Sequence, residues 1–94
     1  MSQKFKLGQL VSTPGVLKLV AELRDPTLLK RLLDRHSVGD WGDLDFEDKE
    51  ANDQGLLHSD RLLSSYKVGE KFDRIWIITE RDRSVTTFLL PEEY

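Results

Sequence analysis

One segment near the C-terminus, RIWIITE at residues 74–80, limits the possible folds more than any other part of the sequence. Alternate residues of a strand point to opposite faces of a sheet, so Ile75 and Ile77 share one face while Trp76 and Ile78 share the other. A strand that is apolar on both faces needs cover on both. We therefore expect Trp76 and Ile78 to be mostly buried, with helices on one face of the sheet and the N-terminal segment, a loop or a partner on the other.

Two more strand-like segments flank this one. RLLSSYKV and SVTTFLL are rich in β-branched and aromatic residues, and the short polar stretches GEKFD and RDR separate the three segments. This pattern predicts an antiparallel β-meander over about residues 61–90. A short β-prone run at Gln9–Ser12 is a candidate for a fourth strand.

Residues from about 14 to 57 carry helix signals. Thr13 followed by Pro14 is a typical N-cap and first helical position, and Asp25-Pro26 repeats the signal. Valines and leucines recur at helical spacing after the first signal and leucines after the second, and Gly39 should end the second helix after about His36. A third helix, over LDFEDKEANDQ, has a weak apolar face and should lie on the surface. The sequence thus predicts an α+β fold, with N-terminal helices packed on a three- to four-stranded antiparallel β-meander.

Length and composition place further limits. The 94 residues are expected to form a single compact domain, 1–94, and the absence of cysteine leaves no disulfide framework and no thiolate metal site. The N-terminus lacks the apolar core of a signal peptide, and no apolar run reaches the length that spans a bilayer. We therefore expect a soluble, cytoplasmic protein with no membrane partner. The sequence indicates no cofactor, no metal site and no particular oligomeric state.

Charge is distributed unevenly along the chain. Residues 1–39 carry a net charge of +4, residues 40–53 carry −6, and residues 54–94 carry −1. Without a dominant basic face, nucleic acid is an unexpected partner. The acidic block is the anomaly that needs an explanation.

Three stretches carry a resemblance to a known family: KFKLGQLVSTPGVL, RHSVGDWGDLDFEDKEAND and IWIITERDRSVTTFLLPEEY. The chain resembles, over nearly its whole length, a family of small bacterial proteins that are labelled plasmid-related and have no established function. The phrases GDWGDLD and IWIITE are the specific parts of the match. The resemblance implies a bacterial origin and a mobile-element setting, and it implies no activity or catalytic residue.

His36 has three possible roles. It could be a general base, or a metal ligand with Asp40, Asp43 and His58 as companions, but no established ligand spacing joins these residues. Its position favours the third role, in which the ring extends the leucine stripe and its cationic form suits the helix C-terminus.

The segment after His36 has both structural and binding interpretations. Trp41 between Gly39 and Gly42 is either a plug for the core, with its indole N–H on a backbone carbonyl, or an exposed binding residue. The structural role is favoured because exposing so large an apolar group needs a reason. Of the carboxylates, Asp43 or Asp45 can cap the third helix. We expect an acidic outer rim that meets a basic partner, formed by Glu47, Glu50 and Asp53. The EF-hand ligand order is absent.

One group of residues resembles an enzyme site. A helix-then-meander layout is loosely similar to barnase-like and RelE-like ribonucleases, which hold a phosphodiester on the sheet. The residues that could do so here are Tyr66, Arg81, Arg83, Thr86 and Thr87. The ordinary interpretation is that the threonines serve the strand and the arginines face solvent. The sequence thus favours a small non-enzymatic accessory protein of a bacterial mobile element that acts by protein binding, with a ribonuclease-type effector or another anti-host factor as the alternative.

Overall fold

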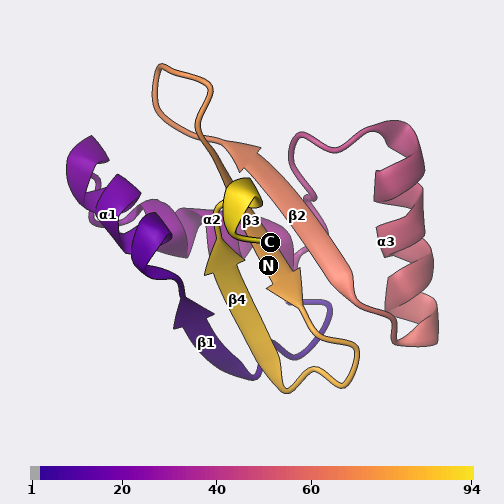
Figure 1. Cartoon of the computed structure of the whole chain (residues 1–94). Helices are drawn as coiled ribbons and strands as arrows, with labels where there is room; N and C mark the ends of the chain where they lie inside the picture. The colour runs from indigo at the N-terminus through magenta and orange to yellow at the C-terminus, as the bar shows by residue number, and fades with distance from the viewer. Residues whose placement is uncertain (1–2) are drawn as a thin grey trace.

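The computed structural model of the chain describes residues 3–94, which form a four-stranded sheet, three α-helices and a short C-terminal 3-10 helix (Figure 1). The strands are β1 (Gln9–Ser12), β2 (Leu62–Lys67), β3 (Arg74–Thr79) and β4 (Val85–Leu89). The helices are α1 (Pro14–Leu23), α2 (Leu28–Ser37), α3 (Phe46–His58) and the 3-10 helix η1 (Pro91–Glu93). The fold is therefore α+β, as the sequence predicted.

The sheet has the strand order β1-β4-β3-β2. β2, β3 and β4 form the predicted antiparallel meander. The expectation of a purely antiparallel sheet was wrong, because β1 pairs in parallel with β4, with Gln9 opposite Val85 and Ser12 opposite Phe88. All three α-helices and two strands separate β1 from β4 in the chain, so no hairpin turn imposes antiparallel pairing. The candidate fourth strand at Gln9–Ser12 is confirmed as β1, and the helices lie between it and the meander, so the description of the helices as N-terminal holds only in part.

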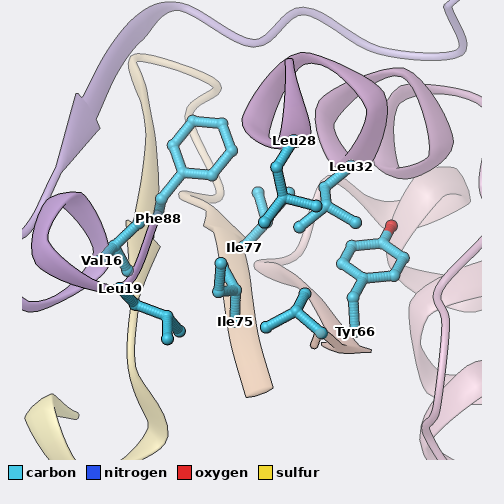
Figure 2. Close-up of a cluster of buried hydrophobic side chains, with 9 residues drawn as sticks. Val16, Leu19, Leu28, Leu32, Tyr66, Ile75, Ile77 and Phe88 are labelled. Carbon is cyan, nitrogen blue, oxygen red and sulfur yellow. The ribbon is translucent and has the colours of Figure 1, made fainter. Parts of the chain in front are cut away.

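One face of the sheet packs against α1 and α2. Figure 2 shows Ile75 and Ile77 of the central strand among side chains from both helices and from the neighbouring strands. The buried cluster consists of Val16, Leu19, Leu28, Leu32, Tyr66, Val68, Ile75, Ile77 and Phe88. All of them except Val68, which follows β2, lie on the inward face of a helix or strand, so the hydrophobic pattern explains the layer arrangement.

The opposite face of the sheet has much lighter cover. Figure 1 shows α2 behind the sheet and only η1 in front of it. Ile78 is buried and Trp76 is largely, though not completely, buried, so the expectation that both are mostly buried is confirmed. The Tyr94 ring meets Trp76 edge-on at a centroid distance of 5.6 Å, and Tyr94 is itself exposed. A single C-terminal turn therefore covers this face only in part, beside Trp76.

The start of α1 follows its predicted capping residue, and the start of α2 does not. The Thr13 side chain accepts a hydrogen bond from the N–H of Val16 at 3.3 Å, as predicted, and donates to the Glu93 carboxylate at 2.6 Å, which ties η1 to the start of α1. The expectation that Asp25-Pro26 caps the second helix was wrong, because α2 begins only at Leu28 and Thr27 is its N-cap. The Asp25 carboxylate instead accepts hydrogen bonds from Arg31, which lower the pKa of Asp25 to about 2.

The unequal cover of the two faces predicts unequal mutational costs. Ile77→Ala should lower the free energy of unfolding by about 2–5 kcal/mol, because it leaves a cavity in the enclosed core. Leu63→Ala should cost clearly less, since Leu63 lies on the opposite face and is only half-buried. Urea denaturation of both variants measures the difference, and equal losses would contradict the assignment of the faces.

Candidate functional site

The loop before α3 pairs with the outer edge of β2. Gly42 and Ser65 form an isolated parallel bridge, in which the N–H of Ser65 donates to the carbonyl of Trp41 at 3.1 Å and the N–H of Asp43 donates to the carbonyl of Ser65 at 2.6 Å. An uncovered strand edge invites pairing with another chain. The loop occupies that edge in the middle of β2.

Asn52 of α3 covers the edge at the start of β2. Its side-chain nitrogen donates to the carbonyl of Leu63 at 2.6 Å, and its side-chain oxygen accepts from the N–H of Leu63 at 3.0 Å. The carboxamide thus takes the place that the backbone of a neighbouring strand would fill. Asn52 is buried, and its role was not predicted from the sequence. A polar residue on the inward face of a helix with few apolar residues was the available signal.

Asp43 covers the next position along the edge. Its carboxylate accepts a hydrogen bond from the N–H of Lys67 at 2.7 Å and lies 3.6 Å from the Arg74 guanidinium. Of the two predicted N-caps, the structure uses Asp45, whose side chain accepts from the N–H of Asp48 at 2.8 Å. Because α3 starts at Phe46, Asp43 lies too far ahead of the helix to cap it.

Trp41 closes the core beneath this loop. It is 3% exposed, so it presents no surface for binding in this structure. Its indole N–H donates to the Asp53 carboxylate at 2.9 Å, not to a backbone carbonyl as expected. Asp53 was assigned to the outer rim, and that was wrong in part, because it anchors α3 to Trp41.

Gly42 permits the close approach of the loop to β2. Its φ angle is +79°, and a Cβ at this position would lie 2.1 Å from the carbonyl oxygen of Ser65. Any side chain here would push the loop off the strand edge.

His36 lies in the core and takes part in a chain of side-chain hydrogen bonds. Its ring has no exposed surface, with Nδ1 at 2.5 Å from Ser64 Oγ and Nε2 at 2.9 Å from Thr79 Oγ1. Thr79 Oγ1 lies 2.8 Å from Thr86 Oγ1, which donates to the carbonyl of Leu7 at 2.7 Å. The ring of His36 therefore continues the buried leucine stripe of α2 as expected, but the expectation of a cation at the end of the helix was wrong.

The carbonyl of Leu7 sets the direction of every hydrogen bond in this chain, because a carbonyl can only accept. The single hydroxyl proton of Thr86 goes to Leu7, so Thr86 accepts from Thr79. Thr79 in turn accepts from Nε2–H of His36. Nδ1 then has no proton and accepts from the hydroxyl of Ser64. His36 is thus the neutral Nε2–H tautomer.

Burial controls the protonation of His36. Desolvation, with a smaller contribution from the positive charge of Arg83, lowers the pKa of His36 to about 3. A Ser–His–Thr arrangement at these distances has the connectivity of a nucleophile, a base and an orienting group. Here it lacks access to a substrate, since Ser64, His36 and Thr79 are all buried. Its chemistry is structural: it satisfies polar groups inside the core and ties the N-terminal segment to the sheet.

The sequence could have revealed part of this chain. Ser64, Thr79 and Thr86 occupy the alternating inward positions of three adjacent strands, next to Leu62, Ile77 and Phe88. Each hydroxyl residue on the core side of a sheet requires a hydrogen-bond partner. His36, on the helix that covers them, is the partner of Ser64 and Thr79.

The residues of the ribonuclease hypothesis do not come together. Tyr66 lies on the helical face, where it is buried and donates to the carbonyl of Asp40 at 2.6 Å, and burial raises its pKa to about 12. Thr87 lies on the opposite face of the sheet, opposite Ile78. Arg81 is exposed on the β3–β4 turn. The sheet itself thus separates the tyrosine from the threonine.

Arg83 has a structural role. Its guanidinium donates to the carbonyls of Asp60 at 2.7 Å, Glu80 at 3.1 Å and Gly55 at 3.3 Å, and it lies over the ring of Phe5. The Gly55 carbonyl is near the end of α3, where a cation suits the helix dipole. Arg83 therefore connects the β3–β4 turn, the end of α3 and the N-terminal segment.

Comparisons of the chain with protein-family models, with curated proteins and with solved structures find no match. Within residues 3–94, no three His, Asp or Glu side chains are grouped so that they could hold a metal ion. In the same part of the chain, no helix has both the length and the apolar character needed to cross a membrane.

The edge cover by Asn52 can be tested by truncation. Asn52→Ala removes the partner of the partly buried N–H and C=O of Leu63, which should lower the free energy of unfolding by about 1–3 kcal/mol. Gln54→Ala, an exposed position on the same helix, is the matched control and should change it by less than about 0.5 kcal/mol. Equal effects in chemical denaturation would refute the role of Asn52.

The burial of neutral His36 predicts a pH dependence. Because the unfolded chain takes up the proton near pH 6.5 and the folded protein only near pH 3, stability is full above pH 6.5 and falls as the pH is lowered toward 3. The slope of the free energy of unfolding against pH should approach about 1.4 kcal/mol per pH unit between pH 6 and 4.5.

Urea titrations at several pH values measure this slope. His36→Gln should flatten it, while His58→Gln, on exposed α3, should keep it. An unchanged slope in a folded His36→Gln protein would show that His36 is not the group responsible.

Proposed function

We propose that this protein is a non-enzymatic binding module, an accessory protein of a bacterial mobile element in the plasmid-related family that it resembles. Its binding surface is the outer face of α3, formed by Phe46, Glu47, Glu50 and Leu57. We name these four residues the α3 surface. Its partner is a protein with a basic surface that also offers apolar contacts.

The observation that carries this proposal is the way α3 is attached. The helix contacts the rest of the fold through its inner side, where Asn52 and Gly55 are buried. On the outer side, Phe46 is 77% exposed and Leu57 is 75% exposed. Large apolar side chains near charged groups at a surface are typical of interaction sites.

Charge supports the same surface. Five ion pairs occur between residues 3 and 94, and none involves a residue of α3. The acids of the preceding loop are different, since Asp40 binds Arg35 at 2.7 Å and Asp43 lies near Arg74. Glu47 and Glu50 therefore remain available to a basic partner, whereas the acids nearer the sheet serve the fold.

The test is capture of partners by the immobilised protein from a bacterial lysate at several salt concentrations. A Phe46→Ser, Glu47→Gln, Glu50→Gln variant should lose the captured protein, and binding by the wild type should weaken as salt is raised, because charges at a rim are screened. A variant with Glu70→Gln and Glu92→Gln, two exposed carboxylates elsewhere, is the matched control and should bind as the wild type does.

Identification of the captured protein then permits a direct affinity measurement with the purified components. Capture that is equal for all three proteins would place the contact outside the α3 surface. Degradation of RNA by the purified wild type would favour the ribonuclease alternative instead.

A further inference from the structure

The outer edge of β1 carries backbone groups without partners. In the pairing with β4, the N–H of Gln9 donates to Ser84 at 2.9 Å and that of Thr13 donates to Phe88 at 3.0 Å. Backbone groups alternate in direction along a strand, so the N–H and C=O groups of Leu10 and Ser12 point away from β4. Within residues 3–94, no hydrogen bond reaches these four groups, and Figure 1 shows β1 as the outermost strand on its side of the sheet.

The side chains of β1 do not protect this edge. Leu10 is 49% exposed and Val11 is 37% exposed. The strand contains no lysine, no proline and no charged residue, which are the usual means of blocking an edge. The other edge of the same sheet, at β2, is covered by Asn52, Asp43 and the backbone of Trp41.

We propose that β1 pairs with β1 of a second copy of this chain, antiparallel and about a two-fold axis at Val11. In this register, Leu10 lies opposite Ser12 of the second copy, and each exchanges both backbone hydrogen bonds with the other. All four free backbone groups of each strand are then satisfied. Val11 lies opposite Val11 of the second copy, a β-branched pair that suits adjacent strands.

Two properties of β1 favour a second copy of the chain as its partner: the face of the sheet on which its side chains lie, and its lack of charge. Opposite residues of paired strands share a face, and Leu10 and Ser12 lie on the same face of the sheet, so the helices of both copies stay on one side. Because β1 is uncharged, no like charges meet across the axis.

The pairing also ends at two copies. The combined sheet would have the order β2-β3-β4-β1-β1-β4-β3-β2, so both outer edges would be the covered edges of β2. This closed arrangement leaves no edge for a third copy. Four residues on each side make a small interface, so the dimer should be weak, with a Kd in the range of about 10 μM to 1 mM.

Analytical ultracentrifugation from about 10 μM to 1 mM, a range that spans this Kd, tests the proposal. The wild type should shift from monomer to dimer, and Val11→Lys should raise the Kd at least about tenfold, because two lysines would meet at the axis. Gln54→Lys places the same charge at an exposed position of α3 outside the α3 surface and should leave the Kd unchanged.

Amide hydrogen exchange supplies a second measurement that needs no variant. The amides of Leu10 and Ser12 should exchange more slowly as the concentration of wild-type protein rises. The proposal is overturned by a wild type that stays monomeric at the highest concentration, by a dimer that Val11→Lys leaves intact, or by slowing that occurs only when a different protein is added.

Discussion

The hydrogen bonds along the outer edge of β2 determine how the acidic segment of this protein is arranged. A four-stranded open sheet has two edges, and β2 is covered along its length by the carboxamide of Asn52, the backbone of residues 41–43 and the carboxylate of Asp43. These contacts hold α3 beside the sheet, although few apolar residues of α3 are buried. The acidic residues in the loop and at the start of α3 therefore have structural roles, because Asp43 binds the edge of β2 and Asp45 caps the helix.

This arrangement divides the roles of the acidic residues. Those near the sheet bind backbone groups, an indole or an arginine, and they fix the loop. Those on the far side of α3 contact solvent beside two exposed apolar side chains, and we assign them to partner binding. The chain from His36 to Leu7 makes a similar contribution inside the fold, because it joins α2, three strands and the N-terminal segment through polar groups that would otherwise be unsatisfied.

The hydrophobic periodicity of the sequence predicted the helices and strands well, because these elements are determined by local sequence patterns. The alternation around Ile77 placed the central strand, and Thr13 placed the start of α1. Parallel pairing of β1 could not be predicted, because it depends on contacts between residues distant in sequence. The roles of Asn52 and His36 depend on such contacts too. Trp41 was understood in outline, but only the structure identifies Asp53 as its partner.

Native-state amide exchange of dilute protein tests the central claim, that the segment from Trp41 to Asn52 covers the edge of β2. The outward amides of this strand belong to Leu63, Ser65 and Lys67. These amides should be protected from exchange nearly as strongly as the amides of the central strand β3. Asn52→Ala should remove the protection first at Leu63. Rapid exchange of all three amides in the wild type would contradict the account.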